Sequence, residues 1–166
     1  SGSAMPGLRI KLKTFENFAN STLNELYTDA RLESAQRFEA RVLANSVLLN
    51  DGTGAFKITP LPRMAQLSPV NCLLLEDLDR DGKVDCLLGQ NFYGAQPEIG
   101  HHDAGASLLL KGNGDGSFKV IPPAVSGIQV PGATMSLQSV DLNGDGRNEI
   151  TFGINQGAIQ VFTPLK

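Results

Sequence analysis

The sequence predicts a mainly β protein built from a repeated unit of short strands, with a short helical segment near its N-terminus. Two pairs of similar segments carry this prediction. SVLLNDGTGAF (46–56) returns as SLLLKGNGDGSF (107–118), and the acidic stretch DLDRDGKVD (77–85) returns as DLNGDGRNE (141–149). The phenylalanines that end the first pair are 62 residues apart, and the aspartates that begin the second pair are 64 residues apart. Because two independent markers agree, we infer a single repeat of this period.

Short apolar runs on either side of each acidic stretch predict the strands of this unit. VNCLLLE (70–76) and VDCLLG (84–89) flank the first stretch, and SLQSV (136–140) and EITFGI (149–154) flank the second. Runs of this length, bounded by Gly, Pro and Asn, are typical of strands, and turns rich in Gly and Asn are typical of hairpins. The near-continuous apolar character of CLLLE predicts a strand that is covered on both faces.

Together these patterns predict two strands in 46–59, four in 70–122 and three in 135–162. Near the C-terminus, AIQVF (158–162) alternates Ile159 and Val161 with Gln160. This alternation predicts a half-buried strand with both aliphatic side chains on the inner face.

The N-terminal part of the chain differs in character. Residues 1–7, SGSAMPG, resemble the remnant of an expression tag followed by a start methionine, so they do not enter the fold prediction. LRIKLK (8–13) alternates apolar and basic residues, which predicts a strand. Residues 14–40 predict one or two short helices packed on the sheet, and Thr22 and Glu25 have capping-box spacing. The expected regions are an N-terminal segment over 8–45 and a repeat region over 46–166.

Composition excludes several classes of protein. The 166 residues suffice for one globular domain, and no apolar run approaches the roughly 20 residues of a membrane helix. The net charge is −3, but seven of the 17 acidic side chains lie in the two acidic stretches, as a cation site requires. The absence of a dense basic stripe with aromatic residues argues against nucleic-acid binding. Cys72 and Cys86 lie in apolar runs and are expected to be buried free thiols.

Each acidic stretch has the spacing of a calcium-binding loop. Calcium takes six to eight oxygen ligands at about 2.3–2.6 Å, and side chains at positions 1, 3, 5 and 9 converge when the chain turns sharply at position 6. Position 6 is a glycine in both stretches, and position 7 offers a backbone carbonyl. The first expected Ca²⁺ site consists of Asp77, Asp79, Asp81, Asp85 and the carbonyl of Lys83. The second consists of Asp141, Asn143, Asp145, Glu149 and the carbonyl of Arg147.

Two other kinds of loop have a similar sequence. An EF-hand requires an acidic residue at position 12 and helices on both sides, whereas position 12 is Leu88 or Phe152 and the flanks predict strands. A pair of solvated acidic turns is the simpler alternative. Two matching loops in register with a repeat favour the calcium interpretation.

With these residues in view, the chain resembles the FG-GAP/VCBS repeats of integrin-α-type β-propellers. In that family the loop D-x-D-x-D-G-x-x-D stands between two strands, as in DLDRDGKVDCLLG and DLNGDGRNEITFG. LLNDGTGAF and LLKGNGDGSF resemble the hairpin of the same repeat. Residues 36–162 are also similar to the C-terminal part of bacterial FG-GAP proteins of the ASPIC/UnbV group.

The resemblance implies four-stranded antiparallel blades in which the calcium loop joins the first two strands. It implies the same ligands as above, although Glu149 is one methylene longer than the usual aspartate. About two blades are expected, fewer than the four of a closed propeller, so the fold class is a partial β-propeller. We therefore expect a fragment of a larger extracellular, periplasmic or cell-surface protein, whose open sheet edges are capped by the helices or by a second copy of the chain.

The expected function is a non-enzymatic, calcium-stabilised scaffold or interaction module with a protein or glycan ligand. One alternative is a carbohydrate- or protein-binding face on the 90–103 loop, which offers Asn91, Phe92 and Tyr93. A less favoured alternative is a hydrolase or lyase that uses the adjacent residues His101, His102 and Asp103. The sequence contains no nucleophile elbow, phosphate loop or HExxH motif, so no catalytic residue is assigned.

Overall fold

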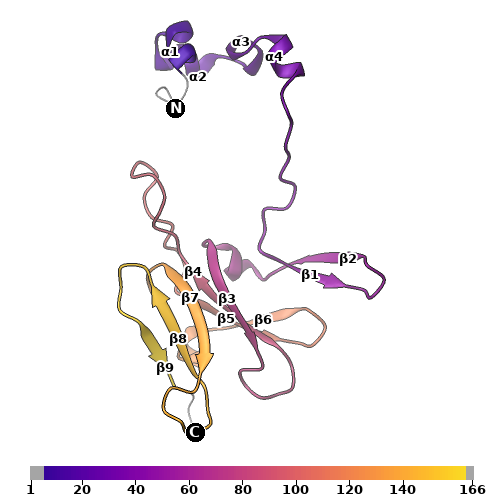
Figure 1. Ribbon diagram of the computed structural model, residues 1–166, viewed down its shortest axis with the longest axis vertical. Coiled ribbons are helices and arrows are strands. Elements are labelled where there is room, and N and C mark those ends of the chain that lie inside the picture. Colours follow the sequence, from indigo (N-terminus) through magenta and orange to yellow (C-terminus); the bar gives the residue numbers. More distant parts are fainter. Residues whose placement is uncertain (1–5, 164–166) are drawn as a thin grey trace. The chain divides into compact units, whose positions relative to one another are not determined.

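The computed structural model of the protein describes residues 6–163 and divides into two units, with the boundary between Val42 and Leu43. Residues 1–5, most of the expected tag remnant, lie outside the described residues. Within the described residues the first unit holds four short helices and the second holds nine strands (Figure 1). The prediction of a mainly β protein is therefore confirmed.

The first unit contains α1 (Pro6–Leu12), α2 (Phe15–Asn20), α3 (Leu23–Leu26) and α4 (Asp29–Glu33). The predicted capping box is present, since the Thr22 side chain accepts from the Glu25 N–H while the Glu25 carboxylate accepts from the Thr22 N–H. The 14–40 segment forms three helices rather than one or two, and its packing on the sheet stays a prediction. Among the described residues, no helix has the length and apolar character needed to cross a membrane.

The strand predicted at 8–13 is wrong, because these residues belong mainly to α1. Pro6 stands at the first helical position, where its fixed φ favours a helix. Leucine, arginine and lysine also have high helix propensity. In addition, the described part of this unit contains no strand that could pair with an extended segment.

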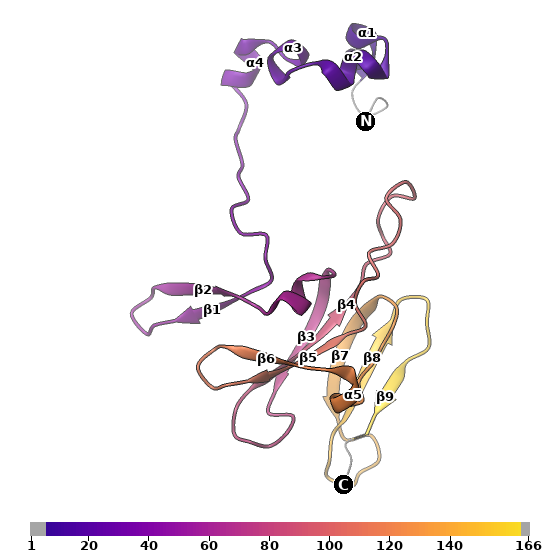
Figure 2. The same ribbon diagram turned by 180° about the vertical axis from the view of Figure 1, so that it is seen from behind.

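The second unit consists of three antiparallel sheets (Figures 1 and 2). The first is β1 (Ser46–Asn50) with β2 (Phe56–Pro60). The second has the order β3 (Val70–Glu76), β4 (Asp85–Gln90), β5 (Leu108–Gly112) and β6 (Phe118–Ile121). The third has the order β7 (Thr134–Val140), β8 (Glu149–Ile154) and β9 (Gln160–Phe162). The 3₁₀ helix η1 (Arg63–Gln66) precedes β3, and α5 (Pro123–Ser126) precedes β7. The predicted division into two, four and three strands is confirmed.

The two hairpins that share a sequence pattern also share their turn chemistry. The Asp51 N–H donates to the carbonyl of Ala55 at 3.1 Å, and the Asn113 N–H donates to that of Ser117 at 3.0 Å. In both turns an aspartate accepts a hydrogen bond from the N–H and from the hydroxyl two residues later. The two hairpins therefore close with the same backbone hydrogen bond, although the accepting aspartate is at different positions: Asp51 is itself the donor of that bond, whereas Asp115 lies two residues after the donor Asn113.

Strand β4 forms the centre of the second unit, because all six of its residues are buried. On one face Cys86 and Leu88 pack in a cluster with Ala65, Leu108 and Leu110. On the other face Leu87 packs against Phe152 of the third sheet and against Ile128 and Val130, which lie in the segment before that sheet. Both cysteines are free, with Cys86 buried and Cys72 partly exposed. The hydrophobic effect thus holds the second and third sheets face to face around β4.

Two of the predicted strand faces differ from the structure. In β3, Leu73 and Leu75 are 54% and 57% exposed, so this strand alternates instead of being covered on both faces. In β9, Val161 is 50% exposed and Phe162 packs inward on Phe152. The inward face of β9 is set by a large aromatic residue at its end, not by the two aliphatic residues.

The connections between strands separate to opposite ends of the second unit. The β3–β4 and β7–β8 connections, which are the two acidic stretches, lie at the lower end in Figure 1. The long β4–β5 connection extends from the opposite end in both ribbon views (Figures 1 and 2). Strand β7 packs against β3 and β4, which brings the two acidic loops into the same region.

Candidate metal centre

The first acidic loop, residues 77–85, is folded by its own carboxylates. The two oxygens of Asp77 accept hydrogen bonds from the N–H groups of Asp81 at 3.0 Å and Gly82 at 2.8 Å. These bonds wrap the backbone around the first side chain of the loop. The turn requires positive φ angles, +83° at Gly82 and +62° at Arg80. Glycine adopts this left-handed region without the steric cost of a Cβ.

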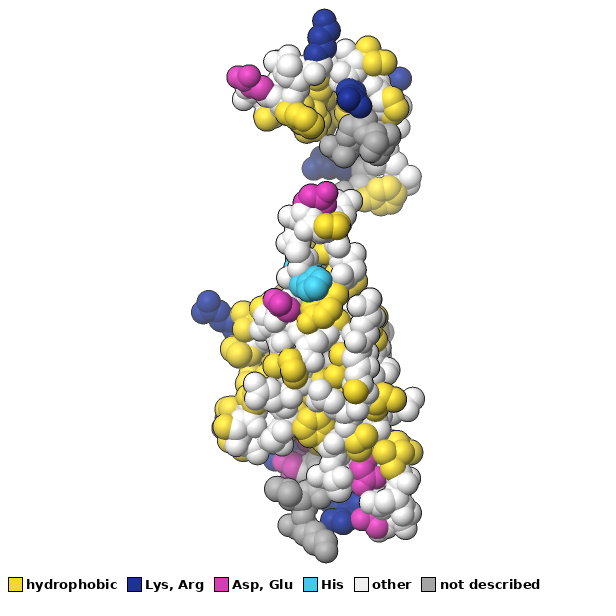
Figure 3. All heavy atoms as spheres, turned by 90° about the vertical axis from the view of Figure 1, so that its left-hand side faces the viewer, with side chains coloured by type: hydrophobic (Ala, Val, Ile, Leu, Met, Phe, Trp, Pro, Cys, Tyr) yellow, Lys and Arg dark blue, Asp and Glu magenta, His cyan; other side chains and the backbone are white. Residues whose placement is uncertain are grey.

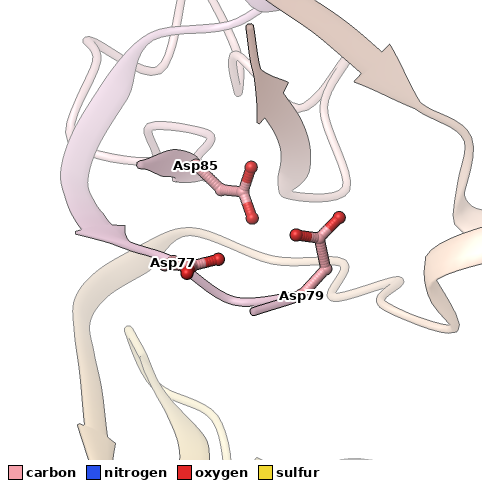
Figure 4. Close-up of side chains that lie close together, drawn as sticks. All are labelled: Asp77, Asp79 and Asp85. Atoms are coloured by element: carbon pink, nitrogen blue, oxygen red, sulfur yellow. The ribbon is translucent and has the colours of Figure 1, made fainter. Parts of the chain in front are cut away.

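Three carboxylates of this loop converge. Asp77, Asp79 and Asp85 each offer one oxygen, and these oxygens lie within 4.8 Å of one another. Figure 4 shows the three carboxylates directed toward a common centre. Because two ligands of one Ca²⁺ at about 2.3–2.6 Å are at most about 5 Å apart, the cluster has the dimensions of a single cation site.

Asp85 is the most strongly fixed of the three. It begins β4 and is only 2% exposed. One of its oxygens accepts from the Leu78 N–H at 3.1 Å and the other from the Gly112 N–H at 2.9 Å. The neighbouring strand β5 and the start of the loop therefore both orient this carboxylate.

Asp81 does not belong to this converging group, and it contacts a cation from another strand. The ammonium of Lys111 in β5 forms ion pairs with Asp79 and, at 2.9 Å, with Asp81. The hydrogen bond from Lys111 lowers the pKa of the Asp81 carboxyl. The Asp81 carboxylate also accepts from the N–H of Lys83, the seventh residue of the loop, at 3.0 Å.

The second acidic loop, residues 141–149, repeats the backbone pattern of the first. The Asp141 carboxylate accepts from the N–H groups of Asp145 at 3.2 Å and Gly146 at 2.9 Å. The Arg147 N–H donates to Asp145 at 2.9 Å, as Lys83 does to Asp81. The Leu142 N–H donates to Glu149 at 2.9 Å, as Leu78 does to Asp85. The two loops therefore share these four hydrogen bonds, and the second loop adds one from the Gly144 N–H to Asp141 at 2.7 Å.

The side chains of the second loop nevertheless differ from those of the first. Asn143 replaces an aspartate, and its amide donates to the buried carboxylate of Glu149 at 3.1 Å. The guanidinium of Arg147 contacts Asp145 at 2.9 Å, and this hydrogen bond lowers the pKa of the Asp145 carboxyl. Within residues 6–163, a group of three converging acids is found in the first loop but not in the second.

The donor set of the first loop suits a hard divalent cation. All of its side-chain donors are carboxylate oxygens, which calcium prefers over nitrogen or sulfur. The Lys111 ammonium already acts as a stand-in cation on two of these carboxylates. The residues of the first loop could therefore hold a divalent cation, whereas the acids of the second loop do not form such a group among the described residues.

The two loops line one groove. Its volume is about 590 Å³, and its walls include Asp77, Asp79 and Arg80 from the first loop and Gly146, Arg147 and Asn148 from the second. Figure 3 shows acidic side chains beside basic ones at the lower end of the second unit, where these loops lie. The groove presents charges of both signs rather than a uniformly acidic surface.

The 90–103 loop, which the sequence suggests as a binding face, contains a buried residue with a structural role. Asn91 is 1% exposed; its amide donates to the carbonyls of Gly105 at 2.7 Å and Gly132 at 3.0 Å. It is therefore a packing residue and not part of an exposed binding face. Tyr93 stacks on His101 with ring centroids 4.2 Å apart, and the backbone of Phe92 pairs with that of His102.

Sequence reasoning did not identify two residues of the site, Lys111 and Gly112. Both reach the first loop from β5, which is 26 or more residues away along the chain. The only sequence signal was their place after SLLL in the second hairpin segment. Their role depends on the pairing of β5 with β4, which the loop motif alone does not specify.

Comparison with known families identifies part of the chain. Residues 77–152, just under half of its length, match the model of the FG-GAP-like repeat. The matched segment includes both acidic loops and the β5–β6 hairpin between them. Searches of curated proteins and of solved structures found no significant match.

Proposed function

We propose that this chain, as an FG-GAP-like repeat protein, is a non-enzymatic interaction module. In this proposal the module is part of a β-propeller and is stabilised by calcium. The repeat supports a propeller-type interaction module. In this proposal β3–β6 form one blade, and β7–β9 form three strands of the next. Each acidic loop then joins the first two strands of its blade.

The observation that carries the proposal is the convergence of Asp77, Asp79 and Asp85 within 4.8 Å. Three carboxylates this close repel one another in the absence of a cation. A calcium ion bound by these groups, with Asp81 and the Lys83 carbonyl, would offset this repulsion and hold the loop between β3 and β4. The second loop would hold a second ion through Asp141, Asn143, Asp145, Glu149 and the Arg147 carbonyl.

A role in catalysis has less support. Carboxylates that bind a metal do not act as a free general acid and base, as glycoside hydrolysis requires. Among the described residues, His101 and His102 do not belong to a group of three metal-ligating side chains. A surface for an unidentified protein or glycan fits the repeat better, and we place it on the blades without assigning a ligand.

We also propose that these sheets belong to a larger ring. The described strands form two, four and three per sheet, whereas a closed propeller needs at least four blades. Further blades would come from additional sequence or from further copies of this chain, pairing at open strand edges. Millimolar calcium outside the cytoplasm suits exposed sites of this kind, which favours an extracellular, periplasmic or cell-surface location.

Thermal unfolding with and without calcium tests the calcium proposal. A ligand that binds only the folded state at about 100 times its Kd adds about 2.7 kcal/mol of stability. The expected result is a rise in Tm of about 5 °C or more on replacing EDTA with saturating CaCl₂. Asp77→Asn should reduce this rise, because it removes a charged ligand without changing side-chain size.

Asp103→Asn is the matched control, since Asp103 is an exposed aspartate outside both loops. It should leave the calcium-dependent rise unchanged. Equal melting temperatures in EDTA and CaCl₂ would show that the loops are acidic turns without a metal. Sedimentation velocity under the same two conditions would report whether calcium also promotes association of the chain.

A further inference from the structure

The position of Lys111 beside the first acidic loop is set by the pairing of its strand in the sheet and not by the loop itself. It is the fourth residue of β5, and its neighbour Leu110 pairs with Cys86 of β4, the residue that follows Asp85. This register directs the lysine over the open side of the loop. Its ammonium contacts both Asp79 and Asp81, and its side chain is 35% exposed.

The Lys111 ammonium occupies carboxylate oxygens that a bound cation would need. Asp79 belongs to the converging cluster, and Asp81 is the fifth-position residue of the same loop. An ammonium that bridges these two carboxylates lies within a few ångströms of any ion they would share. The two positive charges would repel each other, and this repulsion is screened only in part at such short range.

The second loop lacks this arrangement. Phe162 pairs with Ile150 as Leu110 pairs with Cys86, so the residue equivalent to Lys111 is Thr163. Thr163 is exposed and carries no charge. Within the described residues the cation on the second loop is Arg147, which comes from the loop itself and contacts Asp145. The two loops thus have the same backbone but different internal counter-charges.

We propose that Lys111 is a tethered cation that competes with calcium for the first loop and keeps that loop folded when calcium is absent. This inference rests on the proposed calcium binding. The first loop has more carboxylates than the second, and its charge alone suggests a higher calcium affinity. Competition by Lys111 predicts that the difference in affinity between the two loops is smaller than this charge suggests. It also predicts that the first loop exchanges calcium for lysine, whereas the second loop has no lysine with which to make this exchange.

Calorimetric titration of CaCl₂ into variants tests the competition. The background is Asp141→Asn, which weakens the second loop so that the first dominates the heat. In this background Lys111→Met should raise calcium affinity about tenfold or more, the effect of removing one charge a few ångströms from the ion. The same variant should melt at a lower temperature than its parent in EDTA, because Asp79 and Asp81 lose their counter-ion.

Two control variants separate charge competition from a change in packing. Lys119→Met removes the same side chain from the cross-strand partner of Lys111 and should leave calcium affinity within about twofold. Lys111→Arg keeps the charge and should retain the weaker binding. Opposite changes in affinity and EDTA melting temperature are specific to competition, since a misfolded variant would lose both.

The outcomes distinguish this inference from the proposal on which it rests. Calcium binding that is unchanged or weakened by Lys111→Met would overturn the competition while leaving calcium binding intact. An absence of calcium heat in the wild type, in the background and in Lys111→Met would overturn both. Calcium binding that appears only in Lys111→Met would support the competition and would show that the wild-type first loop is held by lysine.

Discussion

Gly112 of β5 lies against the backbone at the end of the first acidic loop. A Cβ at this position would lie 2.0 Å from the carbonyl oxygen of Val84, which is far below van der Waals contact. The same residue donates its N–H to Asp85 at 2.9 Å. Gly112 is therefore required for its lack of a side chain, since any Cβ would move β5 away from the buried carboxylate.

Replacement of Gly112 by alanine should destabilise the protein by about 1–3 kcal/mol, the usual cost of forcing extra atoms into a packed region. The expected result is a lower urea midpoint in EDTA together with weaker calcium binding, because Asp85 loses part of its support. Gly100→Asn serves as the control: Gly100 has open space around it, and asparagine tolerates its φ of +78°. Equal stability of Gly112→Ala and wild type would contradict the close approach to Val84.

At the scale of elements, Phe152 of β8 is the largest buried side chain in the cluster between the second and third sheets. This side chain is fully buried, packs in the cluster with Leu87 and Val130, and meets Phe162 of β9 edge-on at 5.2 Å. It therefore contributes both to the packing between sheets and to the attachment of the edge strand β9.

Phe152→Ala should lower the free energy of unfolding by about 3–5 kcal/mol, because it removes a large buried side chain and leaves a cavity. Chemical denaturation monitored by circular dichroism measures this change. The control is Val161→Ala on β9, where the side chain is 50% exposed and a loss below about 1 kcal/mol is expected. Similar losses in the two variants would show that Phe152 does not hold the sheets together.

Strand positions were predictable from the sequence because their signals are local. Short apolar runs, glycine-rich turns and a repeat of fixed period specify where β3, β4, β7 and β8 lie, with bounds correct to within two residues. The buried face was less predictable, since it depends on which neighbour covers the strand. Thus β3 was expected to be covered on both faces and is not, and the inward residue of β9 is Phe162 instead of Val161. Period-2 alternation at 8–13 likewise failed where helix propensity decided the outcome.

The candidate site shows the same limit. Residues 77–85 are contiguous, so their spacing predicted four carboxylates around one site, and three of them, Asp77, Asp79 and Asp85, do converge. Lys111 and Gly112 come from another strand, and only the register of β5 against β4 brings them to the loop. The charge balance of the site therefore requires the tertiary structure.

Across the whole molecule, aspartates in turns repeatedly act as hydrogen-bond acceptors. Hydrogen bonds lower the pKa of Asp51, Asp81, Asp115 and Asp145, through Thr53, Lys111, Ser117 and Arg147 respectively. Two of these aspartates lie in hairpin turns and two lie in the acidic loops. The repeat thus places a carboxylate as an acceptor at each of four turns, and the ionised form of each favours the folded state.

This dependence sets the response of the calcium-free protein to acid. A carboxyl whose pKa is lower in the folded state stabilises that state above its unfolded pKa, and the contribution disappears as the pH falls through the folded pKa. The ordinary pKa of these aspartates is 3.8, so stability in EDTA should hold from about pH 6 down to about pH 4 and then fall as the pH decreases further. Urea midpoints measured across this range test the sign. Lys111→Met should flatten the acid-dependent loss, because Lys111 is the largest cause of the lowered pKa of Asp81. A wild-type midpoint that stays constant or rises below about pH 4 would mean that these carboxylates do not stabilise the folded state through their charge.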